Sequence, residues 1–98
     1  EVELLPLEYS LEQNYPNPFN PETTIKYSVP RSGNVSLIIY DSLGKLVKLL
    51  VDESKTIGHY EVNWNGKNDL GINVSSGIYF CKMSSHGISK SIKMVLVK

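Results

Sequence analysis

The side chains that most often do chemistry are few in this 98-residue chain and lie far apart in its sequence. There are two histidines, His59 and His86, and a single cysteine, Cys81. His59 falls on the polar side of an alternating run, and His86 falls in a turn between two runs. Cys81 lies in an apolar run, where a free cysteine usually behaves as a small buried hydrophobic residue. Catalysis needs a nucleophile beside a base, paired carboxylates or a metal cluster, so the sequence predicts no catalytic residue and no enzyme.

The oxygen-rich segment Asn65–Gly71, with sequence NGKNDLG, is the best candidate for a metal site. Loops of this kind can hold calcium. However, Lys67 stands at a ligand position of the EF-hand spacing, and no bidentate Glu follows. Asn and Asp also accept hydrogen bonds from their own backbone in tight turns, and Gly supplies positive φ. We therefore predict a turn here and no metal ligand.

Composition excludes several classes of function. The formal net charge is zero and charged residues make up 20% of the chain. This balance leaves no electrostatic footprint for nucleic acid or an anionic membrane surface. The single cysteine rules out an internal disulfide. No motif for a cofactor or a small-molecule substrate is present, so the sequence predicts neither.

Short apolar runs recur at about ten-residue spacing with turn residues between them, which is typical of an antiparallel β-sandwich. The run after Gly33-Asn34 is apolar on both faces, which favours a central strand. One alternative remains at Leu43–Leu50, whose leucines also fit helical spacing; its short length and Gly44 favour a strand. The seven predicted strands are Leu7–Gln13, Thr23–Val29, Val35–Asp41, Leu46–Val51, Gly58–Trp64, Gly77–Ser84 and Ile88–Val97.

Aromatic residues raise a question of binding, because six tyrosines and one tryptophan could line a carbohydrate platform. Yet these aromatics share the alternation face of the aliphatic residues, and aromatics at such positions usually belong to the core. We therefore predict that the following residues are buried: Tyr27, Leu37, Ile39, Val62 and Trp64.

The stretch Asn14–Pro21, with sequence NYPNPFNP, packs three prolines, three asparagines and two aromatics into eight residues. Proline fixes φ, removes a backbone donor and restricts the residue before it. The pattern predicts a stiff loop that is held extended. Tyr15 and Phe19 are expected to plug the open end of the sandwich, and the Asn side chains to satisfy the loop backbone.

Several blocks of sequence, in this order, resemble one family. They are LEQNYPNPFNPETTIKYSVP, VSLIIYDSLGKLVKLL, GHYEVNWNG, SSGIYF and a terminal KMVLVK. From about Leu11 to Lys98 the chain resembles the type A C-terminal sorting domain of the type IX (Por) secretion system of Bacteroidetes. It is also similar to the immunoglobulin-like domain of flagellar hook-capping proteins. The resemblance implies an all-β, seven-stranded antiparallel immunoglobulin-like β-sandwich.

The resemblance also implies a function. Such domains end secreted cargo proteins and are read by an outer-membrane translocon. A sortase-like peptidase then usually removes the domain and can join the cargo to surface lipopolysaccharide. The expected location is therefore the cell surface or the medium, reached through the periplasm and outer membrane. The residues that match the family's sorting motif are Asn14, Tyr15, Pro16, Asn17, Pro18, Phe19, Asn20, Pro21, Gly77, Tyr79, Lys93, Met94, Val95, Leu96, Val97 and Lys98.

The sequence also predicts how the chain is divided and leaves one alternative function open. The chain does not begin with Met, so we expect it to be part of a longer protein, with residues 1–6 as a linker to upstream cargo and residues 7–98 as the sorting domain. The alternative function is an accessory immunoglobulin-like module of an extracellular enzyme, which binds carbohydrate or acts as a spacer. The two functions differ in whether Lys98 is the natural end of the protein.

Overall fold

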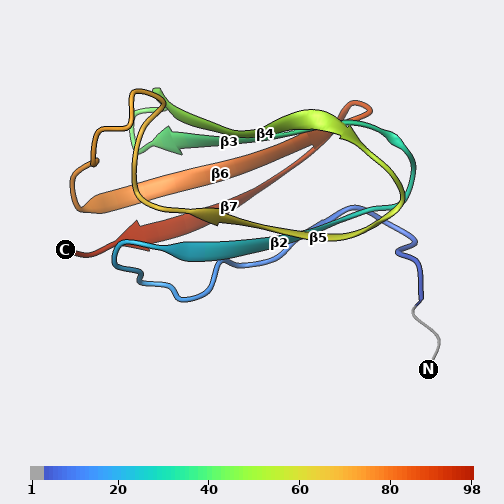
Figure 1. Cartoon of the computed structure of the whole chain (residues 1–98), viewed down its shortest axis with the longest axis horizontal. Coiled ribbons are helices and arrows are strands. Elements are labelled where there is room, and N and C mark those ends of the chain that lie inside the picture. Colours follow the sequence, from blue (N-terminus) through green and yellow to red (C-terminus); the bar gives the residue numbers. More distant parts are fainter. Residues whose placement is uncertain (1–3) are drawn as a thin grey trace.

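Alternating apolar residues build two antiparallel sheets that pack face to face in the computed structural model, which describes residues 4–98 (Figure 1). One sheet has three strands in the order β1-β2-β5, and the other has four in the order β4-β3-β6-β7. The predicted seven-stranded antiparallel sandwich is thus confirmed. The strands are β1 (Ser10–Leu11), β2 (Thr23–Val29), β3 (Gly33–Asp41), β4 (Leu46–Lys55), β5 (Gly58–Trp64), β6 (Gly77–Ser85) and β7 (Ile88–Leu96).

The core lies between the two sheets, and in β3 and β6 it is built from every second residue, as the period of a pleated strand requires. β3 is a central strand with β4 and β6 on either side, as its two apolar faces predicted. Leu43–Leu50, the segment with possible helical spacing, forms a turn and the start of β4 instead. The buried apolar residues are Phe19, Ile25, Tyr27, Val29, Val35, Leu37, Ile39, Trp64, Tyr79, Cys81, Met83, Met94 and Leu96.

Val62 is the one residue of the predicted core set that is only half-buried. It still packs against the core, but it lies on β5, an edge strand of the smaller sheet. The other four residues of the set are all buried, and Trp64 is completely inaccessible. A carbohydrate platform on Trp64 is therefore excluded.

The first predicted strand, Leu7–Gln13, is wrong in extent, because only Ser10 and Leu11 form β1. Ser10 pairs with Ser28 in β2, which ends one residue later, before Pro30. Proline has no N–H and cannot continue a ladder. Leu7 therefore has no partner strand and is 96% exposed.

Strand β4 runs further than predicted. The segment after Val51 was expected to be a polar loop, but the strand continues to Lys55, which pairs with Gly33. β4 is an edge strand, so polar side chains such as Asp52 and Ser54 can extend it while remaining in solvent.

The turn from β3 to β4 shows how the sequence ends one strand and starts the next. The Asp41 carboxylate accepts hydrogen bonds from the backbone N–H of Leu43 and Lys45, both at 2.9 Å. Gly44 takes a φ of 83°, which glycine adopts at little cost. A short polar segment thus reverses the chain without a buried contact.

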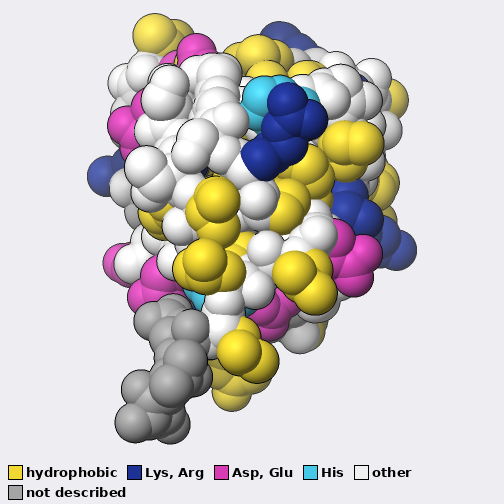
Figure 2. All heavy atoms as spheres, turned by 90° about the vertical axis from the view of Figure 1, so that its right-hand side faces the viewer, with side chains coloured by type: hydrophobic (Ala, Val, Ile, Leu, Met, Phe, Trp, Pro, Cys, Tyr) yellow, Lys and Arg dark blue, Asp and Glu magenta, His cyan; other side chains and the backbone are white. Residues whose placement is uncertain are grey.

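The described chain begins at one end of the sandwich, and the C-terminus lies at the other, beside the loop that precedes β2 (Figure 1). Hydrophobic side chains gather on the first of these ends (Figure 2). Leu4, Leu5 and Leu7 of the segment before β1 are exposed. Within residues 4–98, no helix has the length and hydropathy to span a bilayer.

Candidate recognition site

The proline-rich loop Asn14–Pro21 is bonded to the outer edge of β7, the edge strand of the larger sheet. The Phe19 N–H donates to the Val95 carbonyl at 2.9 Å, and the Val97 N–H donates to the Phe19 carbonyl at 3.0 Å. This is a short parallel pairing of Phe19 with Leu96. The Asn17 side-chain oxygen accepts from the Val95 N–H at 2.9 Å. The loop therefore covers the C-terminal half of an edge that would otherwise expose unpaired backbone groups.

The Asn14 side chain stabilises this loop through hydrogen bonds on its buried side. Its side chain is buried, and its amide donates to the Thr23 hydroxyl at 2.9 Å and to the Pro16 carbonyl at 3.2 Å. Gln13 donates both to the Asn14 side-chain oxygen at 2.6 Å and to the Lys93 carbonyl of β7 at 2.7 Å. Asn14 is thus satisfied as donor and acceptor, which buried polar groups require. The network connects the start of β2 to β7.

An aromatic cluster anchors the loop in the core. The ring of Phe19 lies 5.6 Å from that of Trp64, and Trp64 lies 5.4 Å from Tyr79 in an edge-on arrangement. Such tilted pairs are favourable beyond their burial. The Tyr79 hydroxyl donates to the Ser75 carbonyl at 2.7 Å. Three blocks of the predicted sorting motif, around Phe19, Tyr79 and β7, therefore meet at one end of the sandwich.

A second loop, Asn65–Gly71, lies against the first. Gly66 has a φ of 74°, and a Cβ on it would lie 3.2 Å from the Pro21 carbonyl oxygen. Glycine is needed here both for its conformation and for this close approach. The Trp64 indole N–H donates to the Lys67 carbonyl at 2.9 Å, so the loop closes over the aromatic cluster.

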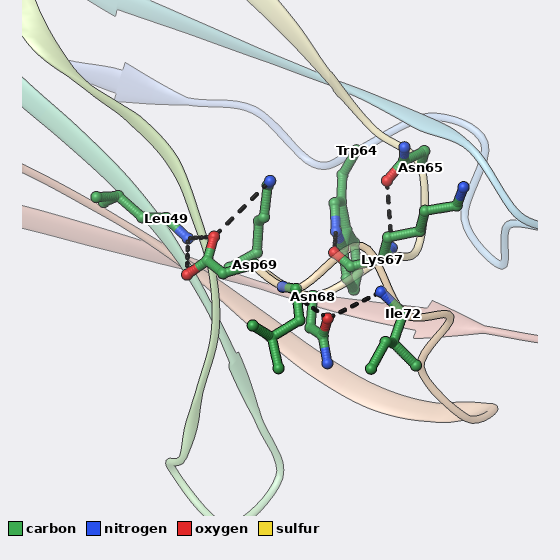
Figure 3. A network of polar contacts seen from close by, with 9 residues as sticks. Leu49, Trp64, Asn65, Lys67, Asn68, Asp69 and Ile72 are labelled. Carbon is green, nitrogen blue, oxygen red and sulfur yellow. Dashed lines mark hydrogen bonds and ion pairs between the residues drawn. The ribbon is translucent and has the colours of Figure 1, made fainter.

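The oxygen atoms of this second loop accept hydrogen bonds from backbone N–H groups (Figure 3). Asn65 Oδ1 accepts from Lys67 at 3.2 Å, and Asn68 Oδ1 accepts from Leu70 and Ile72, both at 3.0 Å. The Asp69 carboxylate accepts from the Leu49 N–H of β4 at 3.1 Å and lies 3.7 Å from Lys48 Nζ. The predicted turn is confirmed. Within residues 4–98, no group of three or more His, Cys, Asp and Glu side chains could hold a metal ion.

Two expectations for the proline-rich loop are wrong. Tyr15 does not plug the sandwich with Phe19: its side chain is 80% exposed, whereas that of Phe19 is 2% exposed. The loop also bends after Tyr15 and after Phe19 instead of running extended. Tyr15 pairs with Thr24 in the smaller sheet and Phe19 pairs with Leu96 in the larger one, so the chain must turn between the two. The peptide bonds before Pro16, Pro18 and Pro21 are cis.

The other predicted motif residues divide by exposure. Met94 and Leu96 face the core, Val95 is half-buried on the opposite face, and Gly77 starts β6 opposite Leu96. The exposed members are Pro16, Asn17, Pro18, Asn20, Pro21, Gly77, Lys93, Val97 and Lys98.

The residues considered for catalysis lie apart. His59 is exposed on β5 with its ring near the Leu4 carbonyl, and the His86 ring lies 3.0 Å from the Ser32 carbonyl. Cys81 is fully buried, and burial raises the pKa of its thiol to about 12. The thiol therefore stays protonated at neutral pH, which makes it a poor nucleophile.

Comparison with known proteins places this arrangement in a family. The model of the secretion system C-terminal sorting domain matches residues 13–98, so the chain belongs to that family. The family is a C-terminal signal for secretion. The match begins at Gln13, the first residue whose side chain bonds to β7. No curated protein matches the chain.

Solved structures share the fold. PorZ, an essential bacterial surface component of the type-IX secretion system of Porphyromonas gingivalis, is 26% identical over 90% of this chain and 11% of its own, with a TM-score of 0.61. Dimeric latent PorU from P. gingivalis is 24% identical over 91% of this chain and 9% of its own, with a TM-score of 0.66. FlgD from P. aeruginosa is 23% identical over 76% of this chain and 59% of its own, with a TM-score of 0.56. This chain therefore spans about a tenth of the length of PorZ and PorU.

Sequence reasoning missed the contact that defines the site. The bonds from Gln13 and Asn17 to β7 join residues 80 and 78 positions apart. Periodicity carries no signal for a pairing of this kind, because it reports the local face of a strand only. Gln13 was not among the predicted motif residues, although it stands directly before them.

Proposed function

We propose that this domain directs an attached cargo protein through the outer membrane by presenting the proline-rich loop and the end of β7 as one joined surface. The recognition residues are the sorting-motif residues identified in the sequence, together with Gln13. The partners are the outer-membrane translocon of the type IX system and its sortase-like peptidase, and the destination is the cell surface or the medium.

One observation carries the proposal: the proline-rich loop and the terminal strand, which are far apart in sequence, are bonded edge to edge. Phe19 exchanges two backbone hydrogen bonds with Val95 and Val97, and Asn17 adds a third. A receptor that contacts this edge therefore meets residues of both blocks in a fixed relation. This arrangement supports recognition of a folded surface in preference to a linear tail.

A non-catalytic role is part of the proposal. The buried thiol of Cys81 has a raised pKa, and each histidine ring lies against a backbone carbonyl. Tyr27 and Tyr60 stack at 5.5 Å, with Tyr27 buried, so they do not support the alternative carbohydrate-binding module.

The proposed division of the chain is a linker followed by the sorting domain. The linker comprises residues 1–6, of which residues 1–3 lie outside the described structure. Leu4 and Leu5 are exposed and lie outside both sheets, which suits a connection to upstream cargo. Cleavage by the peptidase in this region separates cargo from domain.

The test is a secretion assay. Residues 1–98 are fused to a fluorescent reporter with an ordinary export signal, in a host with the type IX machinery. The full fusion is expected at the cell surface or in the medium, and a fusion without Ile92–Lys98 is expected to stay in the periplasm. Equal export of the two fusions would overturn the proposal and favour the accessory module.

A second variant separates recognition from folding. Lys93→Ala with Lys98→Ala leaves the core residues of β7 in place, because both lysines are exposed. Its melting temperature is expected to match that of the native domain while its export falls. Exposed surface substitutions of this kind usually change stability by less than about 0.5 kcal/mol.

A further inference from the structure

The outer face of the larger sheet, which points away from the core, carries a contiguous apolar surface. Strand register places Phe80 opposite Tyr40, and Tyr40 opposite Leu46. Residues opposite each other on neighbouring strands share a face and touch. We define the outer apolar patch as Ile38, Tyr40, Leu46, Leu49, Ile78, Phe80 and Val95.

The patch occupies one half of this face. Ile78 pairs with Val95 at the start of β6, beside the end of the chain. Toward the other end of the strands the outward side chains become polar, and Ser84 pairs with both Ser36 and Ser89. The apolar half therefore lies at the same end of the sandwich as the joined loop and terminal strand.

The solvent exposure of the patch is large for side chains of this kind. Leu46 is 50% exposed, Leu49 42%, Ile78 40% and Phe80 37%. Scattered exposed apolar residues are ordinary, but contiguous ones mark interaction surfaces. At ordinary strand and residue spacings, the four strands and three rows of the patch span on the order of 15 by 15 Å.

The charges on the β6 and β7 side of the patch are positive. Lys93 of β7 pairs with Phe80 of β6, and Lys82 of β6 pairs with Ile38 of β3; both lysines are exposed. On the β4 side two carboxylates lie near the patch: Asp69 is bonded to the Leu49 N–H and lies beside Lys48, and Asp52 accepts a hydrogen bond from the Asn34 side chain. The surface is therefore apolar at its centre and positive along its β6 and β7 margin.

Only the outward-facing residues of the terminal motif are accessible to a partner protein. In β7 the inward residues Met94 and Leu96 are buried in the core, whereas Lys93 and Val95 face outward into this surface. In β6 the same holds for Ile78 and Phe80, which flank the buried Tyr79. These outward residues, Ile78, Phe80, Lys93 and Val95, are not part of the core.

We infer that the outer apolar patch, with Lys82 and Lys93, is the docking surface for a protein of the secretion machinery whose contact face is apolar and carries carboxylates opposite these two lysines. The inference rests on the proposed function and names the surface that is read. Complementary charge selects such a partner and guides its approach.

The experiment compares two double charge reversals in the reporter fusion of residues 1–98. Lys82→Glu with Lys93→Glu changes the margin of the patch. Lys67→Glu with Lys90→Glu is the matched control: it has the same change in charge at exposed lysines, one in the second loop and the other at an inward-parity position of β7. The first pair is expected to lower export about tenfold or more, because like charges across an interface are strongly unfavourable. The control is expected to export as the native fusion does.

A second set of variants tests the apolar centre of the patch. Ile78→Thr with Phe80→Thr keeps strand-forming residues and is expected to lower export, whereas Ile78→Val with Phe80→Tyr is expected to retain it. Lys82→Arg with Lys93→Arg keeps the charge and is also expected to retain export. The melting temperature of each variant shows whether the sandwich is intact, and the exposed lysine variants answer the question even if the apolar pair unfolds.

The outcomes separate the two proposals. If the native fusion is exported and the Lys82/Lys93 reversal is exported equally well, the docking surface is wrong while the sorting function stands. If the native fusion is not exported, both fail. If the native chain binds anionic vesicles and the Lys82/Lys93 reversal does not, the patch is a lipid-binding surface and the proposed protein docking surface is wrong. Concentration-dependent dimers in sedimentation, lost in the Ile78/Phe80 threonine variant, would assign it to a second copy.

Discussion

Two asparagine-rich loops meet at the aromatic cluster, and they are stabilised in different ways. Asn65–Gly71 is held mostly by its own backbone, with Asn65 and Asn68 bonding two to four residues ahead. Asn14–Pro21 is held by a distant strand, through bonds to β7. Local bonds can be predicted from residue types, whereas distant ones depend on how the sheets pack. The loop with distant bonds is also the one that forms part of the predicted sorting motif, together with the terminal strand.

The largest effect is expected from the anchor of the distant loop. Phe19→Ala removes a buried ring from the cluster, and truncating a large aromatic in a core typically costs about 3–5 kcal/mol. Denaturant melts of the isolated chain measure the loss in the free energy of unfolding. Tyr15→Ala, four residues earlier and 80% exposed, is the control and is expected to cost less than about 0.5 kcal/mol. Equal losses would mean that both aromatics support the fold.

The next effect concerns the buried amide in the same loop. Asn14→Ala removes three hydrogen bonds of a buried side chain, to Thr23, Pro16 and Gln13, and we expect a loss of about 1–3 kcal/mol because each such bond typically contributes about 0.5–1.5 kcal/mol. Amide exchange at Val95 and Val97 should also become faster, because Asn14 no longer holds Gln13 and Pro16, which flank the bonds from the loop to β7. Asn20→Ala, at an exposed position of the loop, is the matched control. Unchanged exchange in Asn14→Ala would show that the direct bonds of the loop to β7 hold the edge without Asn14.

A smaller effect is expected in the local loop. Asn68→Ala removes an acceptor for two backbone N–H groups at an accessible site, and we expect a loss of about 1 kcal/mol. Asn68→Asp keeps the acceptor and should retain most of the stability. Export of the reporter fusion should stay at the native level in both variants. If Asn68→Ala lowered export more than Asn14→Ala does, the loop Asn65–Gly71 and not Asn14–Pro21 would be the one that export depends on.

The smallest effect is expected from calcium. The oxygens of Asn65, Asn68 and Asp69 accept from backbone groups, and Lys67 adds a positive charge to the same loop. Titration with calcium should leave the melting temperature unchanged. A saturable rise at micromolar calcium would contradict the turn assignment.

The sequence predicted the features that depend on near neighbours. Alternation identified the strands and placed Trp64, Leu37 and Ile39 in the core, and turn chemistry identified the role of Asn65 and Asn68. It failed where a distant partner decides the outcome. Leu7 alternates well but has no strand to pair with, because β2 ends at Val29.

The site shows the same limit. Tyr15 and Phe19 stand in nearly identical surroundings of Asn and Pro, so no local rule separates them. Their exposure differs because Tyr15 pairs with Thr24 of β2 and its side chain faces solvent, while Phe19 is buried in the core and pairs with β7. The motif residues were identified by resemblance, but their assembly into one surface required the structure.

The pairing of Phe19 with the end of β7 also has a consequence for the order of events during synthesis. Asn17 and Val95 are 78 positions apart, so the loop is made long before its partner leaves the ribosome. Long-range contacts of this kind form late, since most of the chain must be ordered first. A chain that is cut short or still growing cannot complete this edge. If the joined surface is what the export machinery contacts, as proposed, then only a chain that is synthesised through Val97 and folded can be exported.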